Sequence, residues 1–433
     1  MISASDIPPH RNGLRSMLAD GRYPLMAAVI ESGAYFLLNV MLARSSGREI
    51  FGDIAAAMVA ANIIHAVTEG GLAVYFQREA AHPGNGFTAR VRSGLSIRAW
   101  SLVPFGGVFV LYMAGSGNTA PVPGGVAALM LFGAGVGQLL GRLLYGMSRY
   151  RESFLALAVG RIVSVLLAMW AYANGAGAGI VLSGFGAGVL LQIGMLWQAI
   201  RGAGIVLPTG SERSMEREIL SSSVPMGIGL VFVWMYDKMD ILIVRHLLDA
   251  ASVSSYAIAY TVYKIPQVMT GAVLVPLFTR LSRTYANDGV LRYADVTRPA
   301  LMLTAAAAIS MSALWWGSGW FIRTVYGEPY ASASSVTALL LFAVPGVFLN
   351  NLTGVALNSV RSERSVMFTT IGAFLVNIAA NLLLIPAAGI AGAAVATIIT
   401  EYALLLSHSA VMYRSSKFRT GRRRSTGTVA GGS

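Results

Sequence analysis

The chain has 433 residues, of which 55% are hydrophobic and only 12% are charged, and its net charge is +13. About a quarter of the residues of a typical soluble domain are charged, so this composition excludes an ordinary soluble enzyme. The chain contains no cysteine, which excludes disulfides, thiolate zinc sites, iron–sulfur clusters and a cysteine nucleophile.

Twelve apolar runs follow one another along the chain, and each is close to the about 20 residues that a helix needs to cross a bilayer. The predicted spans are 24–43, 52–76, 97–115, 124–144, 154–173, 180–200, 220–244, 255–279, 299–322, 336–357, 367–386 and 391–411. Residues 1–22 are charged and contain no apolar stretch, so we expect no cleaved signal peptide. The predicted fold class is an all-α integral membrane protein.

Lys and Arg are distributed unevenly between the two sides of the predicted membrane. With the amino terminus inside, 24 of the 32 lie in inner segments or in the tail after residue 411, and four lie within spans. The four outer cations are Arg44, Arg48, Arg245 and Arg323. This bias predicts a multi-pass protein with both termini in the cytoplasm. We expect the basic tail to be disordered near anionic lipid, and we expect no nucleic-acid partner because no folded reader domain accompanies it.

The two halves of the chain resemble each other. An offset of 201 residues aligns Pro24 with Pro225, Tyr35 with Tyr236, Asn39 with Asp240, and Arg44 with Arg245. Six spans is an even number, so both halves begin inside and the predicted repeat is parallel, with a pseudo-two-fold axis along the membrane normal. The expected domains are an amino-terminal lobe (1–200), a cytoplasmic linker (201–219), a carboxy-terminal lobe (220–411) and the tail (412–433).

Ionisable residues inside the predicted spans are energetically costly and usually face a cavity or one another. At a rise of about 1.5 Å per residue, two layers are expected. The inner layer contains Glu31, Glu69 and Arg161, and the outer layer contains Asp237, Asp240 and Lys264. The inner layer is either a structural salt-bridge cluster or a substrate or ion site, and the sequence leaves both open.

Helical spacing predicts a polar stripe on span 8. Tyr256, Tyr260, Lys264 and Gln267 recur at three- or four-residue intervals, so they share one helix face. Pro266 removes a helical hydrogen bond and predicts a kink beside Lys264. Lys264 is the best candidate for a charge that changes during transport, because an ammonium can lose its proton and a guanidinium effectively cannot.

Other polar residues lie in the spans, and two of them, His65 and Arg142, have two interpretations each. Tyr35 lies one turn beyond Glu31 on the same face of span 1. His65 is either a proton relay or a histidine satisfied by a neighbouring helix. Arg142 is either a pathway cation or an anchor that reaches the membrane surface. Glu401, near the centre of span 12, has no partner that the sequence identifies.

Several motifs resemble those of a known transporter family. They are Tyr236-Asp237-Lys238-Met239-Asp240, Glu69-Gly70-Gly71-Leu72, Gly146-Met147-Ser148-Arg149-Tyr150, Tyr326-Gly327-Glu328-Pro329-Tyr330 and Asn381-Leu382-Leu383-Leu384-Ile385-Pro386. Together they resemble the polysaccharide and O-antigen flippases, in the superfamily that also contains multidrug extrusion proteins. The resemblance implies two six-helix lobes around a V-shaped cavity lined mainly by spans 1, 2, 7 and 8.

The chain lacks the nucleotide-binding, serine-hydrolase, zinc-protease and dinucleotide motifs, so we expect no enzymatic activity, no cofactor and no metal. The resemblance implies a flippase of the bacterial inner membrane. Its cargo would be a polyprenyl-diphosphate-linked oligosaccharide (an exopolysaccharide, capsule or O-antigen repeat unit), moved by alternating access. Contact with polysaccharide polymerase machinery is a further expectation.

The resemblance also suggests roles for the charged residues. Lys264, Arg161 and Arg142 would attract the diphosphate. The four carboxylates of the two layers would balance these cations and couple transport to H⁺ or Na⁺, and the stripe tyrosines would stack on sugars.

Two alternative functions belong to the same superfamily. The first is a cation-coupled multidrug exporter, in which acidic residues would bind the cargo. The second is a peptidoglycan-precursor flippase, which we expect less because that branch resembles this chain less and usually has two more spans.

Overall fold

The computed structural model describes residues 14–81, 83–84, 86–205 and 213–419. The described chain is almost entirely helical. Its α-helices are α1 (Leu14–Glu69), α2 (Leu72–Ala81), α3 (Phe87–Trp100), α4 (Leu102–Gly115), α5 (Pro121–Gly146), α6 (Tyr150–Ala173), α7 (Ala178–Gly202), α8 (Arg213–Leu247), α9 (Ala250–Lys264), α10 (Gln267–Asp288), α11 (Tyr293–Val325), α12 (Ala333–Leu340), α13 (Val344–Ser359) and α14 (Glu363–Arg414). Two 3₁₀ helices, η2 (Glu328–Tyr330) and η3 (Leu341–Ala343), and two parallel paired strands, β1 (Leu291–Arg292) and β2 (Phe418–Arg419), complete it.

Eight helical stretches in the described chain are long and apolar enough to cross a membrane: six single helices and the end-to-end pairs α3–α4 and α12–α13. Two of them, α1 and α14, are interrupted at Gly47 (φ 74°) and Gly389 (φ 59°). Glycine adopts positive φ without the steric cost that a Cβ would bring, so each interruption is a turn and each of these helices supplies two crossings. With α8, which is bent by 43° at Pro225–Gly227, and the α9–α10 pair, the described helices account for the twelve predicted spans.

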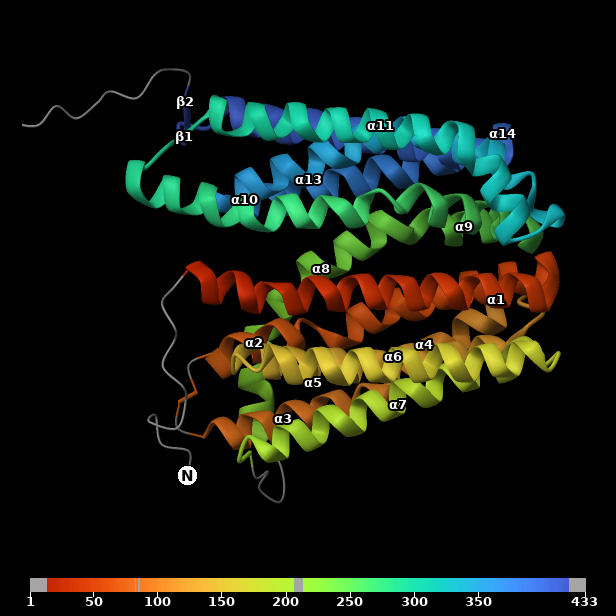
Figure 1. Cartoon of the computed structure of the whole chain (residues 1–433), viewed down its shortest axis with the longest axis horizontal. Helices are drawn as coiled ribbons and strands as arrows, with labels where there is room; N and C mark the ends of the chain where they lie inside the picture. The colour runs from red at the N-terminus through yellow and green to blue at the C-terminus, as the bar shows by residue number, and fades with distance from the viewer. Residues whose placement is uncertain (1–13, 82, 85, 206–212, 420–433) are drawn as a thin grey trace, which may run out of the picture.

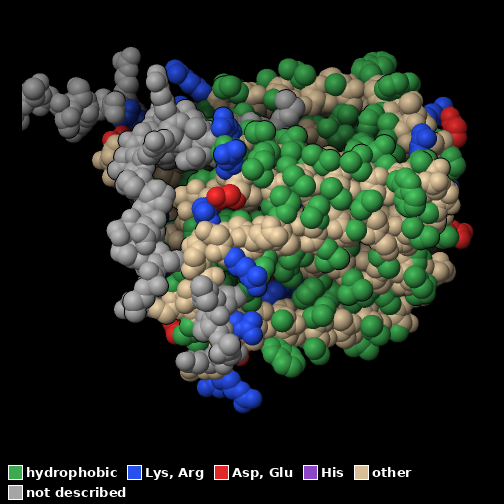
Figure 2. All heavy atoms as spheres, turned by 60° about the horizontal axis from the view of Figure 1, so that its bottom comes forward, with side chains coloured by type: hydrophobic (Ala, Val, Ile, Leu, Met, Phe, Trp, Pro, Cys, Tyr) green, Lys and Arg blue, Asp and Glu red, His purple; other side chains and the backbone are tan. Residues whose placement is uncertain are grey.

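The helices form two lobes. Figure 1 shows α1–α7 in one layer and α9–α14 in a second, with α8 running obliquely from the first layer into the second. The turns α2–α3, α5–α6 and α10–α11 lie at the same end of the bundle as the described ends of the chain. We call this the basic end, and the opposite end, where Gly47 and η2 lie, the distal end. Lys and Arg side chains gather toward the basic end, whereas hydrophobic side chains cover much of the flank (Figure 2).

Span 2 is broken where the sequence predicts a continuous helix over 52–76. The chain leaves α1 after Glu69 and passes through Gly70 (φ 57°) and Gly71 (φ 80°) before α2 begins. The Glu69 carboxylate accepts hydrogen bonds from the backbone N–H groups of Gly71 (2.9 Å) and Ala73 (2.5 Å). It thereby satisfies amides that the start of a helix leaves without partners.

Helix α8 passes directly over this break. A Cβ built on Gly71 would lie 2.5 Å from the Ser223 carbonyl oxygen, and one built on Gly227 would lie 2.4 Å from the Gly70 carbonyl carbon. The two backbones therefore touch without intervening side chains. Glycine at these positions is what allows α8 to cross between the lobes here.

The predicted inter-lobe linker contains parts of two helices. Helix α7 extends to Gly202 and α8 begins at Arg213, so much of the linker predicted over 201–219 is helical, and its residues 206–212 lie outside the described residues. The residue bounds of the lobes stay a prediction.

The tail expected to be disordered from residue 412 is ordered as far as Arg419, and residues 420–433 lie outside the described residues. Lys417 holds this segment in place by donating from Nζ to the carbonyls of Val360 (2.7 Å) and Arg361 (3.2 Å). These carbonyls follow the end of α13 and have no helical partner, so a cation is a favourable ligand for them.

The glycine contact predicts a large effect of one added methyl group. We expect Gly227→Ala to lower the free energy of unfolding by about 1–3 kcal/mol, because the new Cβ must displace the backbone of span 2. The measurement is the thermal unfolding midpoint of the purified protein in detergent. Gly107→Ala is the matched control, since no atom lies within 4 Å of its Cβ position. Equal midpoints for the two variants would contradict the close contact.

Candidate functional site

Four residues of α8 and α9 form a charged cluster within the predicted membrane depth. We call Asp237, Lys238, Tyr260 and Lys264 the lysine–aspartate cluster. The Asp237 carboxylate accepts hydrogen bonds from Lys264 Nζ and from the Tyr260 hydroxyl (2.8 Å), and Lys238 Nζ lies 3.6 Å from its second oxygen. Two ammonium groups thus share one carboxylate, and the three charged side chains are 25–28% exposed.

Tyr260 organises this cluster through its ring as well as its hydroxyl. The Lys238 and Lys264 ammonium nitrogens lie 4.3 and 5.1 Å from the ring centroid, within the range of cation–π attraction. Lys238 is therefore directed at the cluster.

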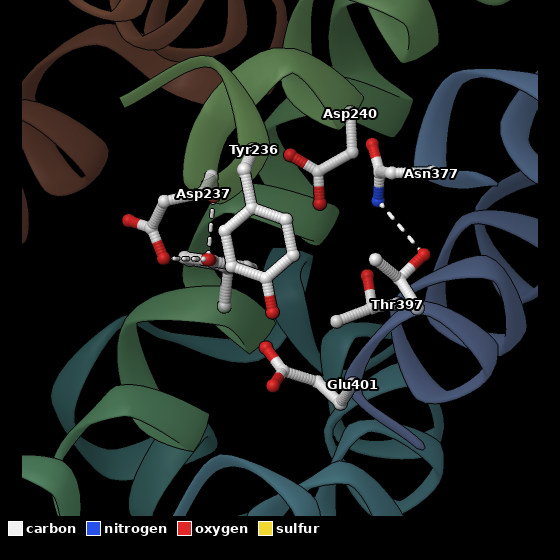
Figure 3. A pocket seen from close by; sticks show the side chains of 8 residues that line it. Tyr236, Asp237, Asp240, Asn377, Thr397 and Glu401 are labelled. Atoms are coloured by element: carbon white, nitrogen blue, oxygen red, sulfur yellow. Dashed lines mark hydrogen bonds between the residues drawn. The ribbon is translucent and has the colours of Figure 1, made fainter. Parts of the chain in front are cut away.

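A polar pocket adjoins the cluster. It is lined by Tyr236, Asp237, Asp240, Tyr260, Asn377, Thr397, Thr400 and Glu401. Figure 3 shows that α8 supplies the two aspartates and Tyr236, whereas α14 supplies Asn377, Thr397 and Glu401. Asp237 and Asp240, two of the three residues expected in the outer layer, both line this pocket.

The carboxylates of Asp240 and Glu401 are both buried and hydrogen-bonded. Asp240 accepts from the Tyr256 hydroxyl, which also lies 3.2 Å from Thr397 Oγ1. Glu401 accepts from Asn350 Nδ2 at 2.7 Å, which identifies the partner that the sequence does not. Asp237, Asp240 and Glu401 thus bring three carboxylates to the lining of one pocket, although no three acidic or histidine side chains among the described residues lie close enough to hold a metal ion together.

The pocket includes α14 residues that the sequence analysis missed. Asn377, Thr397 and Thr400 are polar residues inside apolar spans. Asn377 lies four residues before Asn381 and Thr397 four residues before Glu401, which is a usable signal of shared helix faces. Only the fold shows that this face of α14 meets α8.

The amino-terminal lobe contains a second ion pair. Arg161 on α6 donates from Nη2 to Glu31 Oε1 on α1 at 2.9 Å. The Arg161 side chain is 1% exposed and the Glu31 side chain 44% exposed. The rings of Tyr35 and Phe185 lie 5.4 and 5.8 Å from the guanidinium carbon. The carboxylate is therefore the accessible half of this pair, and the guanidinium is enclosed behind it.

Three predicted site residues have partners elsewhere. Glu69 does not join Glu31 and Arg161, because its carboxylate caps the start of α2. His65 Nδ1 lies 2.8 Å from Arg98 Nη2, so this histidine has a helix neighbour as partner. Arg142 donates to Gln77 Oε1 at 3.0 Å. The inner layer is thus one ion pair and not a three-residue cluster.

The polar stripe of span 8 differs from the expectation. Tyr256 is 0% and Tyr260 4% exposed, so neither ring is open to a sugar. Their hydroxyls bind Asp240 and Asp237 instead. The predicted break beside Lys264 is confirmed: α9 ends at Lys264 and α10 begins at Gln267, so Gln267 lies on a separate helix.

The asymmetry of the Arg161–Glu31 pair generates a prediction. Glu31→Ala leaves an enclosed guanidinium without its carboxylate, and we expect it to lower the free energy of unfolding by about 2 kcal/mol. This value is below the range for a fully buried pair because Glu31 is 44% exposed. Combining it with Arg161→Met should recover part of the loss in thermal unfolding measurements. A double variant no more stable than Glu31→Ala would contradict the assignment.

Comparisons with known proteins place this arrangement in a family. A family model described as lipid II flippase MurJ matches residues 129–426, well over half of the chain. No curated protein matches the chain. The peptidoglycan-precursor flippases, expected to resemble this chain less, thus supply the matching model.

Solved structures share the fold at low sequence identity. The structure "Lipid II flippase MurJ, inward closed conformation" is 16% identical over 93% of this chain and 88% of its own, with a TM-score of 0.66. An inward-facing multidrug resistance MATE family transporter of the MOP superfamily is 12% identical over 89% and 96%, with a TM-score of 0.66. A eukaryotic MATE transporter is 13% identical over 92% and 96%, with a TM-score of 0.64.

These likenesses confirm the predicted fold class of two helical lobes. The matching family model describes a flippase, so the chain belongs among transporters and not among enzymes. The chain belongs to the lipid II flippase MurJ family.

Proposed function

We propose that this chain moves a polyprenyl-diphosphate-linked saccharide across the bacterial inner membrane by alternating access of its two lobes. The observation that carries the proposal is the lysine–aspartate cluster. Its two partly exposed ammonium groups share one carboxylate within the membrane depth. Charges at this depth are costly and usually serve transport, so an anionic cargo group is the natural additional partner.

Lys264 is the proposed ligand of the diphosphate. Without cargo, Asp237 serves as its counter-ion. A diphosphate would compete with Asp237 for the ammonium, because both form charge-assisted hydrogen bonds with it. Tyr260 would keep the two lysines close together during this exchange, since its ring lies near both ammonium groups.

The roles expected for the arginines change with the geometry. Arg161 is enclosed and already paired with Glu31, and Arg142 is bonded to Gln77. We therefore assign the pair of Arg161 and Glu31 to holding α6 against α1 and leave diphosphate binding to Lys264 and Lys238. The tyrosines Tyr256 and Tyr260 position carboxylates and do not stack on the saccharide.

Two cargo types share the diphosphate and differ in the glycan. One is lipid II, the peptidoglycan precursor named by the matching family model. The other is an exopolysaccharide, capsule or O-antigen repeat unit, for which contact with polymerase machinery is a natural extension. Translocation of each cargo by the same proteoliposomes distinguishes them.

Coupling to H⁺ or Na⁺ is proposed for the pocket that Asp237, Asp240 and Glu401 line. This pocket adjoins the lysine–aspartate cluster, and Asp237 belongs to both. Binding of H⁺ or Na⁺ in the pocket would therefore change the electrostatic potential at Lys264.

One observation favours the multidrug exporter as a second candidate. Glu31 presents its carboxylate with 44% of the side chain exposed, which suits a cationic drug. Resistance conferred on an efflux-deficient host would support this function.

The role of Lys264 predicts a loss of transport. In proteoliposomes with labelled lipid-linked oligosaccharide, we expect Lys264→Ala to slow translocation at least about tenfold, equivalent to ~1.4 kcal/mol, because the anion loses its ligand. Lys417→Ala is the control, since Lys417 is the only lysine outside the cluster and should leave the rate near wild type. Wild-type speed in Lys264→Ala would refute the role of Lys264. No translocation by wild type of either cargo would refute the function.

The proposed orientation places the basic end in the cytoplasm. Single cysteines at Asn174 near the distal end and Asn287 near the basic end, both exposed, test this in a chain without native cysteine. A membrane-impermeant maleimide should label Asn174→Cys in intact spheroplasts, and Asn287→Cys only after lysis. The reverse pattern would show the opposite orientation.

A further inference from the structure

The four arginines predicted to lie outside are not equivalent in the structure. Three of them, Arg44, Arg48 and Arg245, donate hydrogen bonds to the other lobe at the distal end. Arg323 is 61% exposed and lies 3.9 Å from Glu328 within its own lobe. Three of these four arginines therefore make contacts between the lobes.

Arg44 reaches from α1 to the end of α11. Its Nε donates to the Val325 carbonyl at 2.7 Å, and its Nη2 donates to the Thr324 carbonyl at 2.5 Å. Helix α11 ends at Val325, so these carbonyls have no helical partner. The guanidinium also lies at the negative end of the helix dipole.

Arg245 makes the corresponding contact in the opposite direction. From the end of α8 its Nη2 donates to the Gly117 carbonyl at 2.9 Å, just beyond the end of α4. Arg44 and Arg245 are aligned by the 201-residue offset between the chain halves. Each lies at the end of the first span of its own lobe. Arg44 donates to two carbonyls, and Arg245 to one, at the end of the third span of the other lobe.

Arg245 has an additional ionic contact. Its Nε lies 2.8 Å from Asp53 Oδ1. The other Asp53 oxygen accepts from the backbone N–H (2.6 Å) and hydroxyl (2.7 Å) of Thr119, and Asp53 is 0% exposed. Asp53 is thus held by its own lobe, and Arg245 is the partner that would leave when the lobes separate.

Apolar and neutral contacts surround these arginines. The Tyr330 hydroxyl donates to the Ala43 carbonyl at 2.8 Å, and its ring lies 6.1 Å from that of Phe51. Burial raises the pKa of Tyr330 to about 12, so its hydroxyl remains protonated and remains a donor. This layer limits water access and so strengthens the nearby charged contacts.

We propose that Arg44 and Arg245 form a reciprocal gate that holds the distal ends of the two lobes together and releases when the cargo leaves. The gate rests on the proposed function, since it requires alternating access. The ionic arm through Asp53 is the stronger one, because its carboxylate is removed from solvent. The gate is reversible, because every donor and acceptor in it can be hydrated once water enters.

The test is the distance between the lobes in the full chain in lipid nanodiscs without cargo. Ala173 on α6 and Ser335 on α12 are exposed near the distal end, and replacing both by spin-labelled cysteine requires no removal of native cysteine. We expect one short distance for the wild-type gate. Arg44→Ala combined with Arg245→Ala and Asp53→Asn should raise the ratio of the long-distance to the short-distance population at least about tenfold.

Two further variants keep the test valid. The triple variant includes Asp53→Asn so that no unpaired carboxylate stays buried. If the triple variant does not fold, Arg44→Ala alone is measured, because it removes only an exposed side chain. Arg323→Ala is the matched control and should reproduce the wild-type distance. Folded triple and Arg44→Ala variants with the wild-type distribution would overturn the gate.

The outcome is independent of the transport assay. A shifted distance in a protein that moves no cargo would support the gate and refute the proposed function. An unchanged distance in a protein that moves cargo would refute the gate alone.

Discussion

A charge inside a bilayer needs a partner, because hydrocarbon cannot solvate it. This constraint explains the arrangement of the intramembrane ionisable residues described above. Arg161 lies against Glu31, and Lys238 and Lys264 share Asp237. The two arrangements differ in their net charge and in their exposure. The arginine is enclosed and neutralised by one carboxylate, whereas the lysines outnumber theirs and remain partly exposed. That difference separates a structural pair from a candidate binding group.

Breaks in the helices place these charges. Glycine turns at Gly47 and Gly389 reverse the chain within what would otherwise be continuous helices. The break at Gly70–Gly71 lets the α8 backbone approach span 2 directly. The break after Lys264 ends α9 beside the cluster. Because the same α8 carries Asp237 in its second half and Arg245 at its end, the cluster and the distal gate are connected by one helix. A movement of α8 between the lobes would reach both.

Much of this could be predicted from the sequence, because long apolar runs and unequal charge distribution are strong signals. The twelve spans follow from them, and Pro266 predicted the break beside Lys264. The role of Asp237 and Lys264 in transport stays a prediction. The hydrogen-bonding partners of the intramembrane residues were harder to predict. Helical periodicity tells which residues share a face but not which helix that face meets, so Glu401 lacked its partner Asn350. The double-glycine break also ended α1 at Glu69, which turned an apparent pathway carboxylate into a helix cap.

Burial was the least predictable property. Tyr256 and Tyr260 have the spacing of a wetted stripe, yet neighbouring helices cover them and direct their hydroxyls to carboxylates. The ordered segment around Lys417 could not be predicted for a similar reason. The Lys417 ammonium donates to backbone carbonyls 57 and 56 residues away, which no sequence pattern marks.

The central claim is that the lysine–aspartate cluster recognises the anionic group of a lipid-linked cargo. The most direct measurement compares translocation, in proteoliposomes of this chain, of a polyprenyl saccharide linked through a diphosphate and of the same saccharide linked through an uncharged group. The account predicts that the diphosphate-linked cargo moves much faster and that this preference disappears in Lys264→Gln. Equal rates for the two cargoes in the wild-type protein would contradict it.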